Sequence, residues 1–136
     1  MKPVPTESSR LHEIVVQLYA GNWNSSVQKA RTLLTTNEAV ALVKELTRSA
    51  GWRERVVAAK VAHAFKLKEL VGPLVQTFGA NPEIYTASAF AKLLVSFEAP
   101  DRNLLLNKLR QACPASPYGS HLLEVIEKAS TCAPDA

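Results

Sequence analysis

The chain has 136 residues, of which 47% are hydrophobic and 21% are charged, and its formal net charge is +4. A chain of this length and composition can build one domain around a hydrophobic core, which excludes an intrinsically disordered protein. The positive charge favours acidic partners, but it is far below the dense lysine and arginine stripe of a dedicated nucleic-acid-binding protein.

Targeting features and cysteine usage indicate where the protein resides. The opening MKPVPTESSR is polar, unlike the apolar core of a secretory signal, and no run of about 18 apolar residues predicts a membrane span. Cys113 and Cys132 have no metal-ligand spacing. We therefore expect a cytoplasmic protein with two free thiols; a disulfide that holds the C-terminal tail to the body is the alternative.

Apolar residues recur at helical spacing along the chain, and no segment alternates as a strand would. The pattern predicts an all-α protein with helices at about 8–20, 24–34, 37–50, 53–66, 67–78, 82–96, 101–112 and 117–129. We expect a single helical domain at 8–129, with flexible termini at 1–7 and 130–136.

Capping residues support these boundaries. Thr35 and Glu38 have the T-x-x-E spacing of a capping box, and Ser116 precedes a proline at the start of the last helix. Gly51 follows the third helix, where a left-handed closing residue is expected. Asn81, which also precedes a proline, is the predicted cap of the sixth helix.

A repeat with a period near 29 residues organises the helices. Trp23 and Trp52 open similar segments and lie 29 residues apart, and Asn81 lies a further 29 residues along. Self-similarity at this period is typical of stacked helix pairs. The predicted units are a capping helix at 8–20, helix pairs at about 22–50, 51–79 and 80–114, and a closing helix at 116–129.

The clearest copy is GWRERVVAAKVAHAF followed by KLKELVGPLVQTF, with a W-R opening, a V-V-A-A core and Pro73 inside the second helix. This pattern resembles the HEAT-like repeat family, in particular its short bacterial form related to the phycobilin-lyase repeats. The resemblance covers roughly residues 22–129. It implies a right-handed α-α superhelix, a solenoid of about three HEAT-like helix pairs with capping helices.

In HEAT-like proteins the second helix of each pair lines the concave face, and the resemblance implies that this face binds a partner. The outward polar residues there are the predicted partner-binding residues: Lys44, Arg48, Lys68, Gln76, Asn107, Lys108 and Gln111. We expect a non-enzymatic protein–protein interaction scaffold whose partner is another protein of acidic character. An adaptor, an assembly subunit and an immunity-type inhibitor all remain open.

Two alternatives are less favoured. Nucleic-acid binding would use Arg53, Arg55 and Lys60 against phosphates, together with lysine and arginine residues of the predicted concave face. An enzyme would need a nucleophile or acid–base group beside an orienting partner, but the three histidines occupy separate helices without a motif. We therefore expect no catalytic residues, no cofactor and no metal. His63 is expected to be partly buried, and Trp23 and Trp52 to pack between repeats.

Overall fold

The computed structural model describes residues 7–49 and 51–131. Within these ranges the chain is helical, without strands, and the all-α prediction is confirmed. The helices are α1 (Glu7–Tyr19), α2 (Trp23–Leu33), α3 (Thr36–Thr47), α4 (Trp52–Phe65), α5 (Lys68–Ala80), α6 (Ile84–Leu94), α7 (Ala99–Gln111) and α8 (Pro117–Thr131). Each begins and ends within three residues of its predicted bounds.

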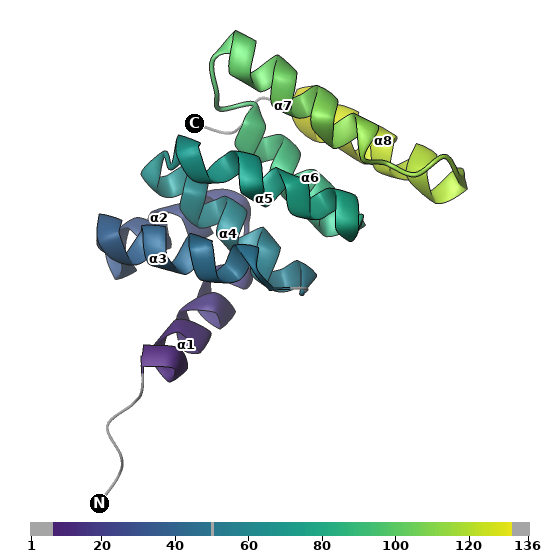
Figure 1. Ribbon diagram of the computed structural model, residues 1–136. Coiled ribbons are helices and arrows are strands. Elements are labelled where there is room, and N and C mark those ends of the chain that lie inside the picture. The colour runs from purple at the N-terminus through teal and green to yellow at the C-terminus, as the bar shows by residue number, and fades with distance from the viewer. Residues whose placement is uncertain (1–6, 50, 132–136) are drawn as a thin grey trace, which may run out of the picture.

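The helices after α1 alternate between two layers. In one layer α2, α4, α6 and α8 pack in series, and we call it the even-helix layer. In the other, the odd-helix layer, α3 packs against α5 and α5 against α7. Helix α1 packs against α2 and α4 at one end of the molecule, and α7 and α8 lie at the opposite end (Figure 1). Each new pair of helices is therefore added beside the preceding pair.

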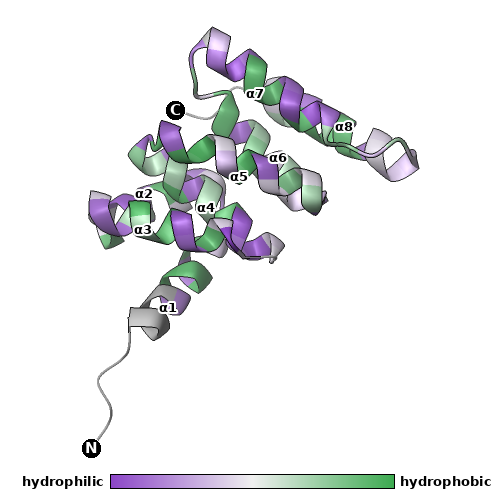
Figure 2. Cartoon of the chain, viewed as in Figure 1, coloured by the Kyte–Doolittle hydropathy of each residue, from purple (hydrophilic) through white to green (hydrophobic). Residues whose placement is uncertain are grey.

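Helix α4 lies at the centre of the molecule, in contact with α1, α2, α3, α5 and α6. Its small residues are fully buried and let these neighbours approach closely: Ala58, Ala59 and Ala62. Large side chains fill the remaining core, and the Phe78 and Phe90 rings meet edge to face at 6.3 Å. Figure 2 shows hydrophilic and hydrophobic residues alternating along α3, α5 and α7, as expected for helices buried on one side only.

The capping predictions at two helices are confirmed. Thr35 and Glu38 form a capping box at the start of α3, with both hydrogen bonds present. At α8 the Ser116 hydroxyl accepts a hydrogen bond from the Gly119 N–H at 3.0 Å. Both contacts satisfy backbone donors that the first helical turn leaves unpaired.

Two other capping predictions are wrong. Gly51 has a φ of −74° and begins α4 rather than closing α3 in a left-handed conformation. Asn81 follows the last turn of α5 and does not cap α6. Helical geometry is disfavoured for a residue that precedes a proline, and Pro82 follows Asn81. Helix α6 instead begins after Glu83, whose carboxylate accepts a hydrogen bond from the Thr86 N–H at 3.2 Å. A carboxylate at this place also interacts favourably with the helix dipole.

The structure describes parts of the predicted flexible termini and one of the two cysteines. Ser130 and Thr131 belong to α8, so this helix extends into the predicted flexible tail. Cys113 is half-buried and free. Cys132 and the predicted termini at 1–6 and 132–136 lie outside the described residues. No helix in the described part is long and apolar enough to cross a membrane.

Candidate functional site

A groove of about 620 Å³ lies between α5 and α7, and we call it the α5/α7 groove. Its lining includes Gly72, Pro73, Gln76, Gly79, Lys108 and Gln111. The groove is open because the residues facing it are small. A Cβ atom on Gly72 would meet nothing within 4 Å, and one on Gly79 would have only the Ala112 Cβ, at 3.9 Å.

Three of the predicted partner-binding residues line this groove: Gln76, Lys108 and Gln111. Both glutamine amides can donate and accept hydrogen bonds, whereas Lys108 supplies a positive charge. The groove thus combines hydrogen-bonding groups of both kinds with one cation.

The other predicted partner-binding residues do not line the groove. Lys44 and Arg48 are exposed on α3, and Arg48 forms a 3.7 Å ion pair with Glu45 that is worth little in solvent. Lys68 pairs with Asp101 across α5 and α7, and this hydrogen bond raises the pKa of Lys68. On α7, Asn107 accepts a hydrogen bond from Arg110 at 3.0 Å.

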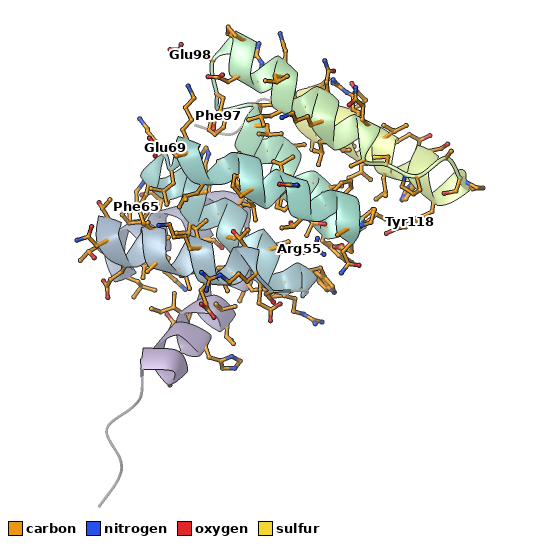
Figure 3. All side chains as sticks on the ribbon, viewed as in Figure 1. Arg55, Phe65, Glu69, Phe97, Glu98 and Tyr118 are labelled. Carbon is orange, nitrogen blue, oxygen red and sulfur yellow. The ribbon has the colours of Figure 1, made fainter. Side chains whose placement is uncertain are left out.

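Arg55 is buried, with 2% of its surface exposed. Its guanidinium donates to the carbonyl oxygens of Thr77 at 3.3 Å and Asn81 at 3.1 Å, at the C-terminal end of α5 (Figure 3). Both acceptors lie at the negative end of the helix dipole, and the Thr77 carbonyl also accepts a hydrogen bond from the Asn81 N–H at 3.2 Å. Burial lowers the pKa of Arg55 from its ordinary value. Arg55 therefore joins α4 to α5.

Lys60 is also buried, and it caps α1. Its ammonium donates to the Leu18 carbonyl at 2.8 Å, to the Tyr19 carbonyl at 3.4 Å and to the Ser26 hydroxyl at 3.0 Å. Burial, with a smaller contribution from the charge of Lys92, lowers the pKa of Lys60 to about 8.

The phosphate-binding alternative placed Arg53, Arg55 and Lys60 on one basic face. The structure separates them, because the donors of Arg55 and Lys60 point at internal carbonyl groups. Only Arg53 is exposed, and its guanidinium lies over the Trp52 ring at 4.6 Å. Residue spacing gave no sign of where these two side chains point, because Arg55 and Lys60 flank an apolar run and their acceptors lie at the ends of other helices.

A second groove, of about 270 Å³, lies on the even-helix layer, and we call it the aromatic groove. Its lining includes four aromatic residues and two lysines: Tyr19, Trp23, Trp52, Tyr85, Lys60 and Lys92. The predicted packing of both tryptophans between helices is thus only part of their role, since each is half-buried and faces a groove.

Sequence reasoning missed Tyr19, Tyr85 and Lys92 as site residues. One signal was available for Tyr85, because the 29-residue register aligns it with Val27 and Val56. Those valines are buried, whereas the tyrosine is 59% exposed. A large, exposed aromatic residue at a position where the other repeats bury a valine is a departure that points to a surface role.

His63 is half-buried, as expected, and its ring lies against Trp23 with centroids 5.5 Å apart. Burial, followed by the charges of Arg31 and Lys66, lowers the pKa of His63. The ring lines a groove of about 440 Å³ together with Glu98, yet its buried Nδ1 has no hydrogen-bond partner among the described residues.

Comparisons of the chain with protein-family models, with curated proteins and with solved structures gave no match. The resemblance to HEAT-like repeats stays a prediction. Among the described residues, no three histidine, cysteine, aspartate or glutamate side chains gather where they could hold a metal ion.

Proposed function

We propose that the chain is a short right-handed solenoid of stacked helix pairs that binds another protein through its odd-helix layer. The alternation of helices between two layers supports the solenoid. The observation that carries the binding proposal is the α5/α7 groove, which is open, lies on the expected layer and contains three residues of the predicted surface.

The chemistry of the groove favours a segment of polypeptide. The side-chain amides of Gln76 and Gln111 offer both donors and acceptors, which is what the N–H and C=O groups of a peptide backbone require. Lys108 is the one charged residue among those that line the groove, and none of the described carboxylates forms an ion pair with it. An acidic side chain on the partner would complement it.

An adaptor, an assembly subunit and an immunity-type inhibitor would all bind in this way. Each needs a surface that recognises one partner and requires no catalytic group on this chain. The protein is expected to act without a cofactor of its own.

The test is capture of partners from a lysate of the source organism, with and without nuclease, using two groove variants. Gly72→Leu fills the groove without a clash at Cβ, and Lys108→Glu reverses its charge. Lys29→Glu, an exposed charge reversal on α2, is the matched control. We expect one protein to be recovered by the wild type and by Lys29→Glu, and to be lost with both groove variants.

Two results would overturn the proposal. The first is recovery of the same protein by the groove variants at wild-type level. The second is disappearance of the captured material on nuclease treatment, which would indicate a nucleic-acid tether. Circular dichroism of each variant separates loss of binding from loss of fold.

A further inference from the structure

The aromatic groove lies on the layer that the proposed protein-binding surface does not use. Its first feature is a stack of rings. The Trp52 and Tyr85 rings are nearly parallel, with an interplanar angle of 20° and centroids 4.6 Å apart, and the Tyr19 ring meets Trp52 edge-on at 5.6 Å. Offset stacking of this kind is the arrangement that aromatic rings prefer.

This stack is closed at Trp52 and open at Tyr85. Trp52 is half-buried and already contacts Tyr19, Tyr85 and the Arg53 guanidinium. Tyr85 is 59% exposed although one face of its ring covers Trp52, so the exposed area belongs to the other face and the edge. This exposed face is where a further flat ring can stack.

The second feature is positive charge at the other end of the groove. Lys92 lies seven residues beyond Tyr85 on α6, which is about two turns, or about 10 Å along the same helix face. Its ammonium is 5.9 Å from the Trp23 ring centroid, and no carboxylate in the described ranges pairs with it. The buried ammonium of Lys60 lines the groove too, but its donors are occupied by Leu18, Tyr19 and Ser26.

We propose that the aromatic groove binds a nucleotide, either free or as one unit of a single-stranded nucleic acid, with its base on the open face of Tyr85 and its phosphate beside Lys92. The separation between Tyr85 and Lys92 suits a ligand whose flat ring and anionic group lie at opposite ends. Stacked bases and backbone phosphates on cations are the contacts by which proteins hold unpaired nucleotides.

The size of the groove limits which ligands it can hold. A volume of about 270 Å³ is below the range of about 300–1,000 Å³ that holds drug-sized ligands, so one ring system fits and a dinucleotide cofactor does not. In a duplex both faces of each base are covered by the neighbouring base pairs, so no face is left to stack on Tyr85 and a duplex is disfavoured. Such a surface holds bases with little regard to sequence, because every base has a flat face.

Tryptophan fluorescence of the full chain tests the proposal. The Trp23→Phe variant leaves Trp52, which stacks on Tyr85, as the sole tryptophan. The probes are adenosine monophosphate, adenosine, inorganic phosphate, a glutamate-rich peptide and a single-stranded adenine oligonucleotide of about eight residues. We expect saturable quenching by adenosine monophosphate at lower concentration than by adenosine or phosphate alone. Binding of the oligonucleotide alone equally supports the proposal and identifies single-stranded nucleic acid as the source.

Two variants locate the contacts. Tyr85→Ala should weaken binding by about tenfold, which is the cost of losing one base-stacking platform. Lys92→Gln should weaken binding of the oligonucleotide and reduce its logarithmic salt dependence by about 0.7. Tyr118→Ala is the control, because Tyr118 is also an exposed tyrosine, 47% exposed on α8, and does not line the groove.

Absence of binding by both the mononucleotide and the oligonucleotide at millimolar concentration overturns the proposal. So does wild-type affinity in Tyr85→Ala, or quenching by the glutamate-rich peptide with none by either nucleotide probe. None of these results bears on capture of a protein at the α5/α7 groove, which the Gly72 and Lys108 variants test separately.

Discussion

Two pairs of basic residues, one pair in each layer, have opposite surroundings. In the even-helix layer Arg55 and Lys60 are 2% and 4% exposed, and both donate to carbonyl groups at the ends of other helices. In the odd-helix layer the side chains of Arg48 and Lys68 are 79% and 64% exposed and pair with surface carboxylates. Since a buried cation must be compensated, the first pair is structural, whereas the second remains available to solvent or to a partner.

Glycine residues divide between the layers in the same way. Gly119 in α8 is buried, and a Cβ atom placed on it would overlap the carbonyl oxygen of Pro114. Gly72 in α5 has open space where its Cβ would lie. The fold thus leaves no room for a side chain at Gly119 and keeps room at Gly72, beside the α5/α7 groove.

The largest effect is expected for Gly119→Ala, which should lower the free energy of unfolding by about 3 kcal/mol, because the obstructing atom is backbone and the preceding loop must move. The same change at Gly72 should alter it by less than about 1 kcal/mol, because its Cβ meets no atom beyond its chain neighbours and the gain in helix propensity is offset by the following Pro73, which disfavours a Cβ in helical geometry. Urea unfolding followed by circular dichroism measures both. Equal effects at the two glycines would contradict the contrast between the two positions.

A smaller effect is expected for Arg55→Met, which keeps the apolar stem of the side chain but leaves the Thr77 and Asn81 carbonyl groups without their charged donor. The free energy of unfolding should fall by about 2 kcal/mol. Arg53→Met, at the exposed position two residues earlier, should change it by less than about 0.5 kcal/mol. If the two arginine variants unfold at the same urea concentration, Arg55 does not hold α4 to α5.

The sequence was sufficient to predict the helices, because apolar spacing alone sets their faces and the capping residues set many of their ends. Thr35 and Ser116 act as predicted, since their side chains reach only their own first turn. Gly51 does not, because it begins α4. Asn81 does not, because Pro82 keeps it out of helical geometry and Glu83 caps α6 instead. Hydrogen bonds within a first helical turn were therefore predictable, whereas the choice between closing one helix and starting the next was not.

The candidate sites were less predictable for the same reason. Residue spacing predicted that Gln76, Lys108 and Gln111 lie on outward faces. Only the packing of α5 beside α7 brings them together around one groove. No local pattern could show that Arg55 and Lys60 turn inward, because their acceptors lie 26 and 42 residues away in sequence. The aromatic groove joins α1, α4 and α6, so its residues become a set only after folding.

The smallest effect concerns Lys60 and depends on pH. At pH 7 Lys60→Met should lower the free energy of unfolding by about 1 kcal/mol, less than Arg55→Met, because the lost hydrogen bonds are partly offset by relief of a buried charge. Lys29→Met, at an exposed position of α2, is the control and should have almost no effect.

The deficit of Lys60→Met should grow as the pH rises from about 8 towards 10.5. The folded chain gives up the Lys60 proton near pH 8, whereas the unfolded chain keeps it up to the ordinary lysine pKa of 10.5. Between these values the unfolded state binds more protons, so stability of the wild type rises with pH relative to a chain without this lysine. Comparing the free energies of unfolding of wild type and variant at pH 7 and at pH 10 cancels the contributions of groups that titrate in both chains. A difference that stays constant over this interval would mean that the Lys60 ammonium keeps its proton in the fold, held by the carbonyl groups at the end of α1.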